Sequence, residues 1–352
     1  MNWEELSAHL QNLPTPDPRF AKRMQERLDS LAKPKGSLGR LEEMAVRLAG
    51  ITASTQPEMV HKRVVVFCGD HGVTEEGVSA YPSEVTGWMM ETFARGQAAI
   101  NVLARQAGAE VKVVDVGSKA DRVPKGVVNV RVRPGTANMA RGPAMSRAEA
   151  EQALAVGWKQ AETAKEQGVQ LLAAGEMGIG NTTAAAAVAA VLTQRDATTL
   201  TGMGTGLGDQ GVRRKAAVIL QSLRINQPDS SDPMDVLAKV GGLEIAAMAG
   251  FMLGAAFYRI PVVIDGLISS VAALAAVHMA PQVREILFAS HLSVEPAHGI
   301  VLEKLGLTPL LDAEMRLGEG SGAVLAFPLM DAALRLSQEM ALLSELGIHS
   351  QS

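Results

Sequence analysis

The composition and charge of the chain exclude several classes of protein. The chain has 352 residues, 47% of them hydrophobic and 20% charged, and its 33 basic and 37 acidic residues give a net charge of −4. This composition is typical of a folded globular protein rather than a disordered or fibrous one, and the length is enough for two domains. The basic residues are scattered rather than gathered in a stripe, so we expect no nucleic-acid partner.

The single cysteine, the N-terminal segment and the longest apolar stretch bear on localisation. Cys68 has no second cysteine with which to form an intramolecular disulfide, and a reducing compartment is the default for such a chain. The first residues, MNWEELSAHLQNL, carry acids where a secretory signal carries a basic region and an apolar run. Charges and a proline interrupt the apolar stretch 240–280, leaving uncharged runs shorter than the ~20 residues that cross a bilayer. We therefore expect a cytoplasmic protein that does not enter the membrane.

Five short apolar runs, each followed by a glycine or a polar cluster, predict the strands of one sheet. They lie at 63–68, 111–116, 171–174, 261–264 and 286–289. Segments with helical spacing alternate with them, at 83–105, 146–166, 184–192, 244–258 and 267–279. This alternation predicts an α/β fold, a Rossmann-like parallel sheet flanked by helices, with the ligand site outside the carboxyl ends of the strands.

The two ends of the chain show helical periodicity without a convincing strand. We therefore expect a small helical domain built from both termini, residues 1–52 plus 323–352. Residues 53–322 would then form a large α/β domain that carries the active site.

The first glycine cluster, GEMGIGNTT at 175–183, follows a predicted strand and opens an alanine-rich helix. Asn181 or Thr182 is a credible N-cap, and exposed amides at a helix start attract phosphate or carboxylate. Taken alone, the segment is at least as well explained as a tight strand-to-helix turn with its cap.

The second glycine cluster, GMGTGLGD at 202–209, precedes the basic residues Arg213, Arg214 and Lys215. Glycine loops beside a basic helix suggest a phosphate site. The cluster lacks the Lys-Ser or Lys-Thr of a Walker loop, and no clear strand precedes it as a dinucleotide fingerprint requires. A surface loop without a ligand explains the spacing equally well.

The third cluster, RLGEGSGA at 316–323, puts Glu319 between glycines just before an apolar helix. It suits a general base or a substrate clamp, although a carboxylate at a helix start is also favoured by the helix dipole alone. Histidines hint at metal only in Asp70-His71 and in the stretch 291–298, where the spacing is wrong and a third ligand is missing. We expect no metal.

Seven segments in the same order resemble one family. They are KPKGSLGRLE, CGDHGVTEEGVSAYPSEVT, GEMGIGNTTAAAA, the glycine loop before Lys215, DGLISSVAAL, SHLSVEPAHG and RLGEGSGAVLAFPLMDAA. From about residue 33 to residue 334, the chain resembles the nicotinate-nucleotide:dimethylbenzimidazole phosphoribosyltransferases. Members of that family move phosphoribose from nicotinate mononucleotide to a benzimidazole, giving α-ribazole 5′-phosphate and nicotinate for the lower ligand of cobalamin.

The resemblance implies a homodimer that acts on these small molecules without a cofactor or metal. It makes Glu319 the catalytic general base, which takes a proton from the acceptor as its other ring nitrogen displaces nicotinate with inversion. The implied substrate-binding residues are Glu176, Gly178, Gly204, Lys215, Ser293 and Leu317, with Tyr81 and Met89 in the base pocket. Tyr81 and Met89 stand where some members carry smaller or polar residues, and Met89 is soft enough to accept purines as well as other benzimidazoles.

Two other functions remain open at this point. A nicotinamide-dependent dehydrogenase would use the α/β alternation and the glycines at 202–208, although the first-turn fingerprint is missing. A nucleotide-binding sensor would use the same glycine loops without turnover.

Overall fold

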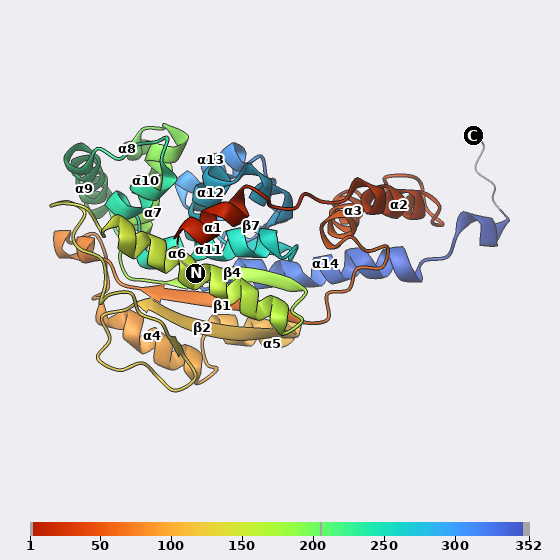
Figure 1. The fold of residues 1–352 in the computed structure, drawn as a ribbon, viewed down its shortest axis with the longest axis horizontal. Coiled ribbons are helices and arrows are strands. Elements are labelled where there is room, and N and C mark those ends of the chain that lie inside the picture. Colours follow the sequence, from red (N-terminus) through yellow and green to blue (C-terminus); the bar gives the residue numbers. More distant parts are fainter. Residues whose placement is uncertain (1–2, 205, 348–352) are drawn as a thin grey trace.

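The computed structural model describes residues 3–204 and 206–347, and its centre is a six-stranded parallel sheet (Figure 1). From one edge to the other the strands are β3 (Val128–Asn129), β2 (Ala109–Gly117), β1 (Lys62–Gly69), β4 (Leu171–Met177), β5 (Val262–Ile264) and β6 (Leu287–Ala289). The predicted α/β fold is confirmed, and all five predicted strands are present. The order, with a switch between β1 and β4, is that of doubly wound nucleotide-binding sheets.

Among the residues that it describes, the structure has three short strands that the sequence did not predict. The edge strand β3 has two residues, and a separate parallel pair joins β7 (His291–Leu292) to β8 (Leu311–Asp312). Runs of two residues carry no detectable period, so these strands are visible only in the structure.

Helices cover both faces of the sheet. They are α1 (Trp3–Leu10), α2 (Pro18–Asp29), α3 (Arg40–Thr52), α4 (Glu84–Ala94), α5 (Ala99–Ala107), α6 (Arg147–Glu166), α7 (Asn181–Thr193), α8 (Ala197–Leu200), α9 (Asp209–Asn226), α10 (Pro233–Val240), α11 (Leu243–Phe257), α12 (Leu267–Met279), α13 (Pro296–Leu305) and α14 (Ser321–Glu339). Helices α11 and α12 pack on one face and α4, α5 and α14 on the other. Helix α6 packs on α11 at very short range, because a Cβ on Gly157 would lie 1.7 Å from the carbonyl oxygen of Ala247.

The helix predicted over 83–105 is wrong in one respect, since the structure divides it into α4 and α5. Gly96 has a φ of 72°, which ends the first helix. The side chain of Asn101 then accepts a hydrogen bond from the Ala98 amide and donates one to the carbonyl oxygen of Phe93. This bend matters for the site, because it turns the start of α5 toward the 316–323 segment.

Helices from the two end regions of the chain meet at one side of the molecule. Helices α2 and α3 pack together and against α14, which extends away from the sheet in Figure 1. Helix α1 packs instead on α6 and α11, where the His9 ring lies 5.7 Å from that of Trp158. The division into residues 1–52 plus 323–352 and 53–322 stays a prediction, and α1 and the first turns of α14 lie with the sheet.

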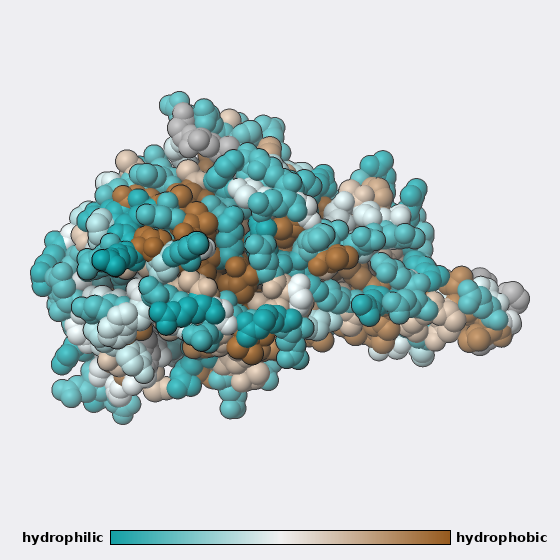
Figure 2. All heavy atoms as spheres, turned by 90° about the horizontal axis from the view of Figure 1, so that it is seen from below, coloured by the Kyte–Doolittle hydropathy of each residue, from teal (hydrophilic) through white to brown (hydrophobic). Residues whose placement is uncertain are grey.

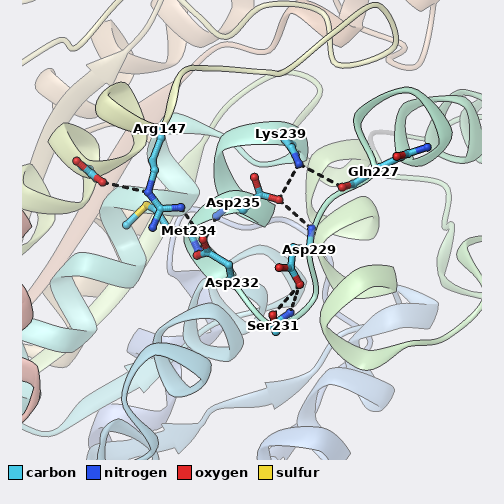
Figure 3. Close-up of polar contacts among 9 residues, drawn as sticks. Arg147, Gln227, Asp229, Ser231, Asp232, Met234, Asp235 and Lys239 are labelled. Carbon is cyan, nitrogen blue, oxygen red and sulfur yellow. Dashed lines mark hydrogen bonds and ion pairs between the residues drawn. The ribbon is translucent and has the colours of Figure 1, made fainter.

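A network of charged side chains fixes α10 against α6 (Figure 3). Asp232 caps α10 by accepting hydrogen bonds from the amides of Met234 and Asp235, at 3.0 and 3.2 Å. Arg147 of α6 lies 2.6 Å from the Asp232 carboxylate, and Lys239 pairs with Asp235 at 2.9 Å. This end of α10 therefore has a conventional cap supplied by the residue that precedes the helix.

The surface seen in Figure 2 is mainly polar, with apolar side chains gathered in separate patches on the large body. Among the described helices, none is both long and apolar enough to pass through a bilayer.

Candidate active site

A pocket of about 650 Å³ opens at the carboxyl ends of β4 and β5. Of the nine residues that the sequence predicted for the site, eight line it: Tyr81, Met89, Glu176, Gly178, Gly204, Ser293, Leu317 and Glu319. The ninth, Lys215, lies directly behind the pocket wall. The sheet therefore brings together segments that are more than two hundred residues apart in the chain.

Glu319 is held in the pocket by an unusual backbone conformation. Its φ is 63°, in the left-handed region that residues other than glycine seldom adopt, and Gly318 and Gly320 on either side are also left-handed. Its Oε2 accepts a hydrogen bond of 3.1 Å from the amide of Ile100, in the first turn of α5. The side chain is only 5% exposed, and burial raises the pKa of the carboxyl, with a further contribution from Asp265.

Glu176 lies beside Glu319, near the end of β4. Gly318 has a φ of 90°, and a Cβ there would lie 2.2 Å from the Glu176 Oε1, so the backbone conformation and the close contact both favour glycine. The Glu176 Oε2 accepts a hydrogen bond from the side-chain amide of Asn181. Burial raises the pKa of Glu176 to about 8, and the nearby carboxylates of Glu244 and Asp265 add to the effect. Near neutral pH the protonated form is therefore favoured.

The start of α7 differs from the prediction. The N-cap is Gly180, with a φ of 96°, and neither Asn181 nor Thr182 caps the helix. Both side chains have other partners: Asn181 binds Glu176, and the hydroxyl of Thr182 accepts a hydrogen bond from Lys215. A Cβ on Gly180 would lie 2.8 Å from the Thr74 side chain, so the tight turn itself requires glycine.

Lys215 is a buried cation next to the second glycine cluster. It projects from α9, is 1% exposed, and its Nζ lies 2.7 Å from the Thr182 hydroxyl and 3.4 Å from the carbonyl oxygen of Gly202. Gly204, with a φ of 54°, brings its backbone so close that a Cβ would lie 3.1 Å from this Nζ. Burial lowers the pKa of Lys215 to about 8.

Glu295 is a pocket residue that the sequence marked only as part of a weak metal motif. Its Oε1 accepts a hydrogen bond of 2.9 Å from the Gly204 amide, so it fixes the second glycine cluster in place. Its Oε2 is buried without a hydrogen-bond partner. No local pattern marks this role, because Glu295 and Gly204 are 91 residues apart in the chain.

The two histidines of the 291–298 stretch have structural partners. His298 accepts a hydrogen bond from the Ser293 amide at Nδ1, so its Nε2 carries the proton and donates to Ser270. Burial lowers the pKa of His298 to about 3, which keeps the ring neutral. Within residues 3–204 and 206–347, no three His, Cys, Asp or Glu side chains gather as ligands of a metal ion would.

Asp70 and His71, whose roles the sequence left open, support the pocket from behind. His71 Nε2 lies 2.7 Å from Glu244 Oε1, and both side chains are buried. Asp70 accepts hydrogen bonds of 2.7 Å from the Thr86 hydroxyl and from the amide of Lys119. These contacts join the end of β1 to α4 and α11.

Asp265 is the pocket residue that the sequence missed most clearly. It follows β5 directly, is 3% exposed, and its carboxylate accepts hydrogen bonds from the first turn of α14. A buried aspartate at the carboxyl end of a predicted strand was the available signal. The arrangement as a whole is a pocket with several buried carboxylates on one wall and a buried ammonium behind another.

Comparisons with known proteins give one consistent result. The model of a phosphoribosyltransferase family matches residues 13–348. A nicotinate-nucleotide:dimethylbenzimidazole phosphoribosyltransferase of Halalkalibacterium halodurans is 51% identical, over 94% of this chain and 93% of the relative, and one of Desulforudis audaxviator is 52% identical, over 92% of each. The crystal structure of CobT from Thermus thermophilus has a TM-score of 0.90 at 47% identity and covers 95% of this chain and 100% of that one. The chain therefore belongs to the nicotinate-nucleotide:dimethylbenzimidazole phosphoribosyltransferase family of enzymes.

Proposed function

We propose that the pocket transfers 5-phosphoribose from nicotinate mononucleotide to 5,6-dimethylbenzimidazole or a related flat base, giving α-ribazole 5′-phosphate and nicotinate. The observation that carries this proposal is the buried Glu319 carboxylate, held by Ile100 at one wall of the pocket, with the Lys215 ammonium behind another wall. The names of the relatives support the same reaction.

The chemistry needs a base more than an acid. Nicotinate mononucleotide has a cationic leaving group, so its bond to C1′ breaks without protonation or a Lewis acid, and no cofactor is required. One ring nitrogen of the acceptor attacks C1′ from the face opposite nicotinate, which inverts the configuration from β to α. Glu319 accepts the proton from the other ring nitrogen, which becomes acidic as charge develops. Burial makes Glu319 a stronger base than an exposed glutamate.

The phosphate fits the cluster around Lys215. Gly204, Thr182 and Ser293 line the pocket, and the Thr182 hydroxyl lies 2.7 Å from this ammonium. The Gly204 amide itself donates to Glu295. We therefore assign the Thr182 hydroxyl and Lys215 to the phosphate. A doubly charged phosphate beside Lys215 would favour the protonated ammonium, which burial alone disfavours. Fixing the phosphate orients C1′ toward Glu319, and orientation is a large part of the catalysis available to a two-substrate reaction.

Glu176 faces the developing positive charge of the ribosyl group. Its raised pKa follows from burial among other carboxylates, and a cationic ribosyl centre nearby stabilises the ionised form. When it is ionised by the bound cationic substrate, the Glu176 carboxylate stabilises the ribosyl group most where its positive charge is greatest, which is the condition for preferential stabilisation of a transition state.

The acceptor base fits between apolar side chains. Met89, Val85, Ile179 and Leu317 line the pocket together with Tyr81. Tyr81 and Leu317 are 55% and 56% exposed, so the mouth of the pocket presents apolar surface to a partner. We include a homodimer in the proposal for this reason. We also include cytoplasmic localisation, because a chain with a single cysteine, Cys68, fits a reducing compartment.

The test is incubation of the purified protein with nicotinate mononucleotide and 5,6-dimethylbenzimidazole, without added metal, followed by chromatography and mass spectrometry. We expect α-ribazole 5′-phosphate and equimolar nicotinate. Product with adenine or another purine in place of the benzimidazole would widen the acceptor class. Binding of nicotinate mononucleotide without product from any base would instead indicate a sensor.

A further inference from the structure

The carboxylate of Asp265 occupies the amino terminus of α14. Its Oδ1 accepts hydrogen bonds from the amides of Gly322 at 2.7 Å and Ala323 at 3.0 Å, and its Oδ2 accepts one from Gly320 at 3.1 Å. The remaining amide of the first turn, that of Ser321, donates to the carbonyl oxygen of Gly318. All four amides that a helix start leaves without intrahelical partners are therefore satisfied, three of them by one side chain from the end of β5.

The segment held in this way includes Glu319. Residues 318–320 are three consecutive left-handed residues, with φ values of 90°, 63° and 86°. A left-handed conformation is unfavourable for a glutamate and persists only where its surroundings impose it. The Glu319 amide donates to the carbonyl oxygen of Glu176 at 3.3 Å, and a Cβ on Gly175 would lie 2.3 Å from the Glu319 carbonyl oxygen. The backbone of Glu319 is thus fixed between β4 on one side and the Asp265-bound helix start on the other.

Asp265 is itself well fixed. Its amide donates a 2.7 Å hydrogen bond to the Ser269 hydroxyl, and its Oδ1 lies 3.7 Å from His291 Nδ1. Burial raises the pKa of Asp265, and His291 and the amides at the positive end of the 19-residue helix α14 oppose this shift by favouring a charged carboxylate. In the part of the chain that the structure describes, three backbone amides donate to the Asp265 carboxylate, whereas one, that of Ile100, donates to the Glu319 carboxylate.

We propose that Asp265 is a positioning residue that sets the reactive geometry of Glu319 through the start of α14. The proposal rests on the function proposed above and deepens it. Asp265 fixes the backbone at 320–323, this fixes the left-handed Glu319, and the Glu319 carboxylate then meets both the Ile100 amide and the acceptor. Loss of the carboxylate at 265 should impair the proton transfer while the proposed contacts of Thr182 on α7 and Lys215 on α9 with the phosphate stay intact.

The main test is the Asp265→Asn variant. The amide keeps one acceptor oxygen, and its NH₂ group faces amides that are themselves donors, so the helix start must shift. We expect kcat to fall about 10- to 100-fold, since a displacement of ~1 Å at a reacting group has an effect of this size. KM for nicotinate mononucleotide should stay within about threefold of the parent value, whereas a general loss of packing would change both constants.

The matched control is Asp232→Asn. Asp232 also caps a helix by accepting hydrogen bonds from two amides, but it lies at the start of α10 and does not line the pocket. We expect its kcat and KM to remain within about twofold of the parent, as for a surface substitution.

A double-mutant cycle shows whether Asp265 acts through Glu319 or contributes to catalysis independently of it. If Asp265 acts through Glu319, adding Asp265→Asn to Glu319→Gln should lower the remaining activity by less than about threefold, because groups that act as a unit are not additive. Full additivity, or a kcat of Asp265→Asn equal to that of the parent, would overturn the inference. Absence of any product from the parent would overturn the proposed function instead.

A milder variant keeps the test decisive if Asp265→Asn does not fold. Ser269→Ala removes the acceptor for the Asp265 amide and leaves the carboxylate in place. We expect a smaller fall in kcat, about threefold to tenfold by the same geometric argument, that disappears in the Glu319→Gln background. A fall that persists in that background would contradict the role assigned to Asp265.

Discussion

Helices α7 and α14 begin at the same pocket in nearly the same way, but the groups that face their first-turn amides differ. Each follows a left-handed glycine, Gly180 or Gly320, that provides no side-chain cap. At α14 the amides are occupied by a carboxylate of the protein, Asp265. At α7 the amides of Asn181 and Thr183 donate to backbone carbonyl oxygens, and within the described residues no carboxylate accepts from the first turn. Lys215 lies behind Thr182.

The difference shows that a helix start can be used either for a ligand or for the protein itself. An anion-binding amino terminus that is filled internally becomes a rigid support, and here it supports the left-handed Glu319. An amino terminus without an internal anion stays available, and a lysine beside it adds the charge that a phosphate requires. The sequence patterns GEMGIGN and RLGEGSG are similar, so what separates their roles is the residue that the fold brings opposite each one.

The largest expected effect comes from removing the base at the α14 side. Glu319→Gln keeps the size and the contact with Ile100 but cannot accept the proton. We expect kcat to fall by about 10² to 10⁴, the usual contribution of a general base. The affinity for nicotinate mononucleotide, measured by calorimetry, should change little, because the phosphate contacts lie at the α7 side. Equal loss of binding and turnover would show that Glu319 is also needed to bind nicotinate mononucleotide, which would contradict the account.

The matching change at the α7 side is Lys215→Met, which keeps the length of the buried stem. We expect KM for nicotinate mononucleotide to rise about 10- to 100-fold, from the loss of a charge-assisted hydrogen bond to phosphate. The exposed Lys159, which pairs with Glu162 on α6, provides the control variant Lys159→Met with an unchanged KM. A fall in kcat at constant KM would contradict a role in phosphate binding.

The pH dependence of kcat sharpens the account of Glu319. Burial, together with Asp265, raises the pKa of this carboxyl, whereas the Ile100 amide opposes the shift. Because the base acts only when ionised, kcat should fall on the acid side at a pH above the ordinary glutamate value of 4.5. A profile measured from about pH 4 to 8 should lose this acid limb in Glu319→Gln. Retention of the same limb in the variant would assign it to another group.

The smallest effect is on stability, at Glu176. Its pKa in the folded protein, about 8, lies above the ordinary value of 4.5, so the unfolded chain releases this proton at lower pH than the folded one. Folding stability from this group is therefore complete below pH 4.5 and is lost as pH rises toward 8. Glu176→Gln has no such proton, and its Tm should exceed that of the parent by a few degrees at about pH 8 but not at about pH 5. A difference that does not vary with pH would contradict burial as the cause.

The strands, helices and pocket segments of this molecule could be predicted from the sequence, whereas most hydrogen-bond partners of the pocket side chains could not. Apolar runs and helical periods indicated the five main strands, and glycine clusters indicated the pocket segments, because both signals are local. The prediction that Asn181 or Thr182 caps α7 was wrong, because the Asn181 side chain binds Glu176 on β4 and the Thr182 hydroxyl binds Lys215 on α9. Neither contact can be inferred from the local sequence. Asp265 was missed for the same reason, since its three acceptor contacts lie 55 to 58 residues along the chain.

We propose that the phosphate binds near the start of α7 and that the acceptor base binds near the start of α14. The most direct test is a crystal structure of the Glu319→Gln variant with nicotinate mononucleotide and 5,6-dimethylbenzimidazole bound. We predict a phosphate within hydrogen-bonding distance of Thr182 and Lys215, the acceptor base against residue 319, and Asp265 still bound to the amides at the start of α14. A phosphate bound at the start of α14 with Asp265 displaced, or an acceptor base far from residue 319, would contradict the account.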